Sequence, residues 1–158
     1  MIRYPLILRL IHWFTALMFI PMLAGGYFWL RPMASSDPFK LEALMYHMAI
    51  GTFLVLLTVL RLVLRLRMAH PDTSGLAMWT HRALYLCVFL MPVSGFTMVF
   101  SARLNEIVFA RSGEPLPADM ATITGHFWHG STALALTLII ALHISSAVKD
   151  RQTIRRMV

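Results

Sequence analysis

The sequence has few charged residues and a single cysteine. Only 13% of its 158 residues are charged, whereas 58% are hydrophobic. A soluble domain usually carries about 25% charged residues, so this chain has too little polar surface to cover a water-soluble globule. The lone Cys87 excludes an intramolecular disulfide. No internal repeat, low-complexity segment or cleavable signal peptide is evident, since the first apolar run is too long for a signal peptide.

Long apolar runs make up most of the sequence. Four of them are each long enough to cross a bilayer as a helix of about 20 residues or more. The sequence therefore predicts an all-α protein, an integral membrane four-helix bundle with up-down-up-down order and one domain over residues 1–158. The expected helices cover about residues 6–30, 41–66, 77–101 and 124–148. The stretch 104–109 in the last loop is expected to form a short interfacial helix.

The basic residues predict the orientation of the bundle. Ten of the 14 lie at the termini or around the connection between the second and third runs, and four lie in the other two loops. Cytoplasmic loops carry the excess of Lys and Arg, so both termini are predicted to be cytoplasmic. The net charge of +7 also raises the possibility of nucleic acid as a partner. Because the basic residues lie between apolar runs, a membrane surface is the better partner and no nucleic acid is expected.

Four histidines are expected at two depths in the bilayer. His12 and His143 each lie five or six residues from the cytoplasmic end of a predicted helix, which is roughly 9 Å of depth. His47 and His129 lie equally far from the outer ends of theirs. Histidine is costly in hydrocarbon, so these residues indicate a functional site. The depths pair His12 with His143, and His47 with His129.

The fourth predicted helix carries one histidine of each pair. His129 and His143 are 14 residues apart, close to four helical turns, so they share one face at a separation of about 21 Å. Two planar macrocycles, one near each membrane surface, fit that separation. His126 is about 100° away from the face of His143 and nearer the water, so it ranks below His129 as a candidate ligand.

Two histidines at each depth suit haem iron, with one ligand above and one below the plane. A zinc site needs three or four ligands at one depth. Without a C-x-x-C-H attachment motif the haem is expected to be b-type. Arg9 and the Arg61 and Arg65 pair are candidates to meet the propionates of the inner haem, with Arg31 or Lys40 for the outer one, although basic residues at helix ends are usually membrane anchors.

Simpler interpretations stay open for these residues. A single membrane histidine often just hydrogen-bonds a neighbouring carbonyl, but four at matched depths make this less plausible. His81, at the start of the third helix, suits a headgroup contact or a hydrogen bond to a quinone or propionate. His70 is interpreted as a surface residue. The four tryptophans near the ends of the runs are typical of an aromatic belt, and the 12 methionines suit an irregular core.

Motifs along nearly the whole chain resemble the prokaryotic cytochrome b561 family. The matching segments are R-Y-P-L-I-L-R-L-I-H-W with His12, M-Y-H-M-A-I-G with His47, L-R-L-V-L-R-L-R, T-H-R-A-L-Y-L with His81, M-P-V-S-G, and W-H with His129, followed 14 residues later by His143. The resemblance implies two b haems, each with two axial histidines, in the bacterial inner membrane. It also implies electron exchange with ubiquinone in a respiratory chain, and superoxide oxidase activity in at least one branch.

Four functions remain open from the sequence. The first is an electron-transfer cytochrome between a redox partner protein and the ubiquinone pool. The second is an enzyme that oxidises superoxide at the outer haem and reduces ubiquinone; the outer segments hold four basic and five acidic residues, which gives no net field to attract this anion. The third is a haem-carrying membrane anchor subunit of a dehydrogenase or hydrogenase. The fourth is a structural or transport bundle without redox activity.

Overall fold

The computed structural model describes residues 3–68 and 75–157, and within them every regular element is helical. The long helices are α1 (Leu6–Gly25), continued by the π-helical turn η1 (Gly26–Leu30), then α2 (Lys40–Arg67), α3 (Gly75–Ser101) and α5 (His126–Lys149). The short ones are α4 (Leu104–Val108), the 3-10 turn η2 (Met120–Thr122) and α6 (Arg151–Met157). His70 lies outside the described residues.

The four long segments are apolar and long enough to cross a membrane, which confirms the predicted all-α membrane protein. Their bounds differ from the expected ones by no more than two residues at either end. Pro21 and Pro92 lie inside α1 and α3. Proline is tolerated in membrane helices because neighbouring groups satisfy the carbonyl that it frees.

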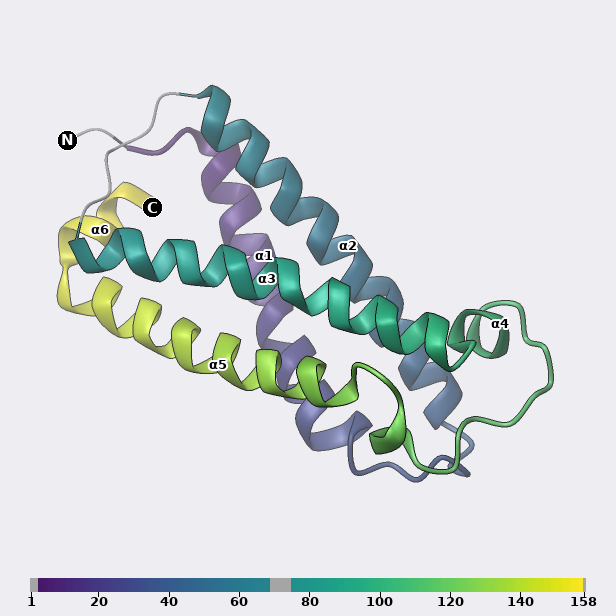
Figure 1. Cartoon of the computed structure of the whole chain (residues 1–158). Helices are drawn as coiled ribbons and strands as arrows, with labels where there is room; N and C mark the ends of the chain where they lie inside the picture. The colour runs from purple at the N-terminus through teal and green to yellow at the C-terminus, as the bar shows by residue number, and fades with distance from the viewer. Residues whose placement is uncertain (1–2, 69–74, 158) are drawn as a thin grey trace.

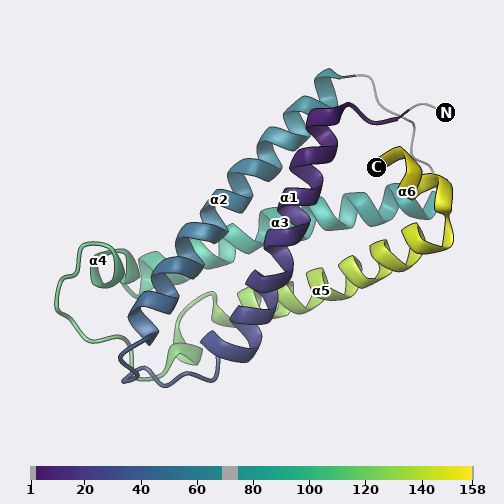
Figure 2. The same cartoon turned by 180° about the vertical axis from the view of Figure 1, so that it is seen from behind.

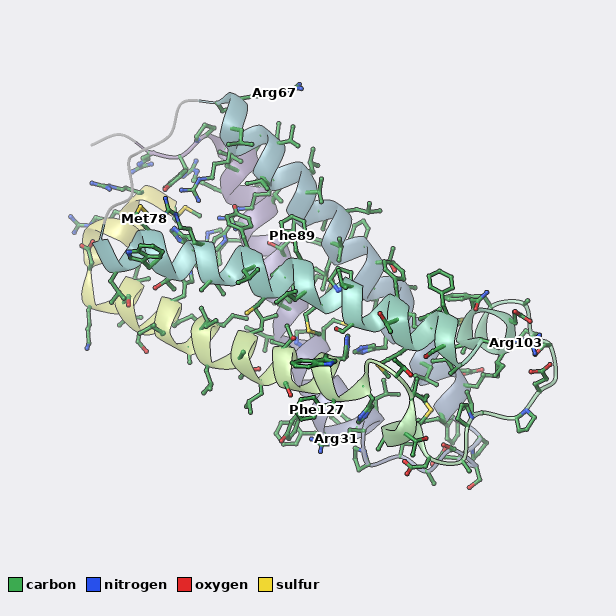
Figure 3. The ribbon with its side chains drawn as sticks, viewed as in Figure 1. Arg31, Arg67, Met78, Phe89, Arg103 and Phe127 are labelled. Atoms are coloured by element: carbon green, nitrogen blue, oxygen red, sulfur yellow. The ribbon has the colours of Figure 1, made fainter. Side chains whose placement is uncertain are left out.

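The bundle consists of two helix hairpins. Helix α1 packs mainly on α2, and α3 packs mainly on α5, with fewer contacts between the two hairpins (Figures 1 and 2). The chain termini meet at one end, where the Tyr4 amide donates to the Arg156 carbonyl over 3.1 Å and Trp13 Nε1 donates to the Met157 carbonyl over 2.9 Å. This end is called the inner end below, and the end with α4 the outer end. Arg67 and Arg103 lie at opposite ends of the molecule (Figure 3).

The outside of the bundle is apolar. Leu17, Phe28 and Leu138 are each exposed by more than 60% of their surface, as lipid-facing side chains are. The buried hydroxyls of Thr15 and Thr58 instead donate to carbonyls four residues earlier in their own helices, at 2.7 and 2.9 Å. Without water in the bilayer core, polar groups have to find partners inside the protein, and these residues do so within one turn.

The outer loop packs against the outer end of α2. The predicted short helix is present as α4, and its residues Leu104, Ile107 and Val108 are buried against Leu44 of α2. Arg103, at a left-handed φ of 52°, precedes α4 and pairs with Glu106 and, over 3.2 Å, with Glu114. The hydrogen bond from Arg103 holds the pKa of Glu106 below its ordinary value.

Lys40 closes the outer end of α1. It is only 3% exposed, and its Nζ donates to the carbonyls of Leu30 at 2.5 Å and Met33 at 2.8 Å. The last carbonyls of a helix have no partner within the helix, so this ammonium acts as a cap for η1. These bonds give Lys40 a structural role and do not support its interpretation as a propionate partner.

Replacing Lys40 with Met tests this cap. The variant leaves two carbonyls without their charged donor, and hydrogen bonds to charged groups contribute about 1.5–3 kcal/mol. We expect the thermal midpoint of the purified protein in detergent to fall. Arg67→Met, an exposed change at the last residue of α2, serves as the control; equal midpoints for the two variants would contradict the cap.

Candidate functional site

The structure brings four histidines together as two pairs of rings. The ring centroids of His12 and His143 are 6.1 Å apart at the inner end. Those of His47 and His129 are also 6.1 Å apart, nearer the outer end. These are the same pairs that the depths in the sequence predict. In each pair one ring comes from the α1–α2 hairpin and the other from α5, so each pair spans the gap between the hairpins.

The spacing within each pair suits a shared metal ion. The two rings of each pair are steeply inclined to one another, at interplanar angles of 84° for the inner pair and 72° for the outer pair. Two imidazoles that bind one metal from opposite sides, through bonds of about 2.0–2.1 Å, have their ring centres roughly 6.3 Å apart. Among the described residues, no group of three or more His, Cys, Asp or Glu side chains is arranged to hold a metal ion. Each pair therefore offers two ligands, which is the number that an iron held in a planar macrocycle needs.

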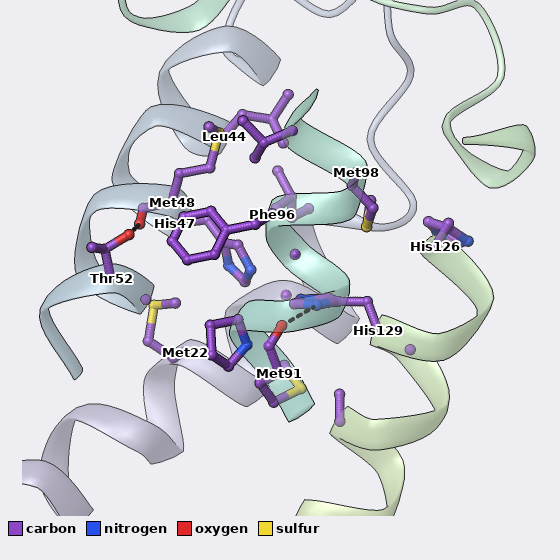
Figure 4. Close-up of a pocket in the computed structure, with 18 of the residues that line it drawn as sticks. Met22, Leu44, His47, Met48, Thr52, Met91, Phe96, Met98, His126 and His129 are labelled. Atoms are coloured by element: carbon purple, nitrogen blue, oxygen red, sulfur yellow. Dashed lines mark hydrogen bonds between the residues drawn. The ribbon is translucent and has the colours of Figure 1, made fainter. Parts of the chain in front are cut away.

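A cavity of about 660 Å³ surrounds the outer pair. Figure 4 shows His47 projecting from α2 and His129 projecting from α5 into this space, with Met22, Met48 and Phe96 around them. Ligand pockets span about 300–1,000 Å³ and are mostly apolar. The volume, the apolar wall and the two facing imidazoles together fit a b-type haem.

The ring of His129 is held in a defined orientation. Its Nδ1 lies 3.2 Å from the carbonyl of Met91 and 3.1 Å from Oγ of the buried Ser94. A carbonyl only accepts, so Nδ1 carries the hydrogen and Nε2 keeps the lone pair that binds a metal. Metal-binding histidines characteristically donate their second N–H in this way. Ser94 in turn donates to Leu90 or Met91 within α3, at 3.0 Å.

Two glycines allow these imidazoles to lie against the helices. A Cβ added at Gly26 would be 3.3 Å from Cε1 of His47, and one at Gly95 would be 3.4 Å from Cε1 of His129. Gly26 begins the π-helical turn η1, and such turns are frequent at functional sites. The M-P-V-S-G segment thus supplies a carbonyl, a hydroxyl and a missing side chain to His129. No role was predicted for Ser94 from this motif, although a serine two residues after a helical proline indicates a polar group that needs a partner inside the bundle.

His126 also lines the outer cavity, with Arg31 and Tyr27. The ring that faces His47 is nevertheless that of His129, and Figure 4 shows His126 farther from His47. Arg31 lies over the Tyr27 ring, 5.2 Å from its centroid. His126 and Arg31 are therefore residues of the cavity wall rather than of the facing pair.

The inner level holds a third histidine. The His81 ring centroid is 5.2 Å from that of His143, closer than a headgroup contact would suggest. Helix α3 begins at Gly75, two residues earlier than expected, so His81 lies as many residues into α3 as His12 lies into α1. His81 Nδ1 and the hydroxyl of Tyr85, one turn later, are buried and have no hydrogen-bond partner in the described structure.

Two arginines lie toward the same end of the molecule. Arg61 of α2 is half-buried and interacts electrostatically with His12 and His143. Arg9 precedes His12 by one turn of α1 and lines a small groove with Trp13 and Met157. The roles of Arg9 and Arg61 as propionate partners stay predictions.

Comparison with known proteins gives one match. The family model described as prokaryotic cytochrome b561 matches residues 3–158. Neither the curated proteins nor the solved structures that were compared with the chain include a significant match.

Gly125 holds the start of α5 against α3 and offers a test of this arrangement. It has a φ of 96°, and a Cβ there would be 2.8 Å from the Ser94 carbonyl. Gly125→Ala is expected to destabilise the protein by about 1–3 kcal/mol through backbone strain. Gly25→Ala is the control, because Gly25 is helical and its Cβ would meet nothing within 4 Å; helix propensity alone should stabilise this variant by about 0.5–1 kcal/mol. Thermal unfolding in detergent measures both, and shifts of the same sign would contradict the packing.

Proposed function

The chain belongs to the prokaryotic cytochrome b561 family, and on that premise we propose that it carries two b haems and transfers electrons across a membrane between a redox partner and ubiquinone. Membership of the family implies haem b and membrane electron transfer. The number of haems, their ligands and the quinone partner are our proposal.

The facing imidazole pairs carry this proposal. His12 with His143 and His47 with His129 have the same ring separation of 6.1 Å, and each pair bridges the two hairpins. We assign these four residues as the axial ligands of an inner and an outer haem. The apolar cavity around His47 and His129 supports the outer assignment.

When bound, a haem with two histidine ligands supplies a one-electron redox centre that has no open position for a substrate. The protein supplies the ligands, their orientation and a dry environment. Helix α5 contributes one ligand at each level, His129 and His143, at an axial separation of about 21 Å. The chain itself therefore holds two electron carriers at a fixed separation across most of the bilayer.

The proposed location is the bacterial inner membrane, with the inner end in the cytoplasm. Arg3, Arg9, Arg67, Arg155 and Arg156 lie near that end, which satisfies the excess of basic residues in cytoplasmic segments.

Buried donors at the inner level suit a ligand with oxygen acceptors. His81 Nδ1 and the Tyr85 hydroxyl lack partners in the described structure, and unpaired polar groups are costly at membrane depth. A haem propionate or a quinone carbonyl satisfies the same donors, so we propose His81 and Tyr85 as residues that bind one of these groups beside His143.

The structure offers little support for superoxide as the substrate at the outer end. Of the four outer cations, Lys40 is bonded to two carbonyls and Arg103 is paired with two carboxylates. Arg31 lies on the Tyr27 ring, and Arg111 donates to Met45 Sδ. Carbonyls, a ring and a sulfur do not neutralise Lys40, Arg31 or Arg111. The outer segments nevertheless hold five acidic residues against these four cations, which gives no net positive field to attract an anion, so electron transfer with a redox partner is the function favoured here.

Haem quantitation by the pyridine haemochrome spectrum tests the proposal. We expect two haems per chain in the wild type and one in His143→Ala, which lacks a ligand of the inner pair. His129→Ala should also retain one haem. His126→Ala is the matched control on α5 and should retain two. A colourless wild type, or unchanged haem content in both ligand variants, would eliminate the proposed ligand set.

Neighbouring glycines allow a second test of the outer site. Gly26→Leu forces a side chain against the His47 ring, which a Cβ alone would approach to 3.3 Å, so we expect haem content to fall toward one per chain. Gly25→Leu meets nothing within 4 Å at its Cβ and should retain two. Equal haem contents would show that His47 does not depend on Gly26.

A further inference from the structure

The two pairs differ in the hydrogen bonding of their imidazoles. His129 Nδ1 donates to the Met91 carbonyl and the Ser94 hydroxyl, at 3.2 and 3.1 Å. In the described part of the chain neither inner ligand, His12 or His143, makes a hydrogen bond of this kind. Ser94 is 7% exposed, so water does not compete for its oxygen.

Such bonds change the electron density of a ligand. An imidazole that donates its N–H to oxygen acceptors becomes a more basic ligand through its other nitrogen. A more basic ligand stabilises the oxidised, more positive iron, and hydrogen bonding near a haem is one of the means by which proteins set its reduction potential. Met91 and Ser94 therefore act to lower the potential of an iron bound by His129.

We propose that Ser94 and the Met91 carbonyl are positioning groups for His129 that lower the midpoint potential of the outer haem below the value it would have without these hydrogen bonds. The inference rests on the proposed function, because it needs both haems.

Potentiometric titration of the purified full-length protein, followed by its visible spectrum, tests the role of Ser94. The wild type should show two midpoints. Ser94→Ala removes the hydroxyl acceptor, so the midpoint of the outer haem, which is the one that His129→Ala lacks, should shift to more positive potential and the other midpoint should stay in place. Ser101→Ala, an exposed serine on the same helix, should move neither. If Ser94→Ala fails to retain the outer haem, Ser94→Cys keeps the volume with a weaker acceptor and should give a smaller shift of the same sign.

The outcomes separate this inference from the proposed function. Two haems whose midpoints do not respond to Ser94→Ala, or respond in the other direction, would overturn the role of Ser94 and leave the proposed function intact. A wild type with fewer than two haems refutes the proposed function, and the inference with it.

Discussion

Two pairs of imidazoles facing one another across the gap between two helix hairpins are the interaction on which the rest of this structure depends. The hairpins make most of their contacts internally, and an apolar cavity of about 660 Å³ separates them around the outer pair. A ligand that binds both walls contributes stability only to the assembled state. Binding of the proposed haems would therefore be coupled to the association of the two hairpins.

The bilayer explains why the remaining polar groups are where they are. Since lipid offers no hydrogen-bond partners, the hydroxyls of Thr15 and Thr58 donate to carbonyls within their own helices. Lys40 donates to the carbonyls of Leu30 and Met33 at the outer end of η1. Ser94 also bonds within its own helix, but additionally accepts from His129. The Ser94 hydroxyl thus has a partner within its own helix and also helps to orient His129 on the neighbouring helix.

Much of the fold and of the facing pairs follows from simple periodicity. The rise of 1.5 Å per residue was enough to match His12 with His143 and His47 with His129 by depth, because membrane helices have a common reference at the bilayer surface. Their role as haem ligands stays a prediction. For His81 the sequence left two interpretations open, a headgroup contact or a hydrogen bond near the inner haem, because the start of its helix was set two residues late; the structure places its ring 5.2 Å from that of His143.

The sequence by itself determined the number of spans, their approximate ends, the excess of basic residues at one end and the depth of each histidine, because these depend on composition and position along a helix. Only the tertiary structure decided which face of each helix meets which neighbour. That choice joins the Met91 carbonyl and Ser94 to His129, turns Lys40 toward Leu30 and Met33, and brings Arg61 near the inner pair. Rotation of a helix about its axis depends on side-chain packing between helices that are distant in sequence, and no local pattern records it.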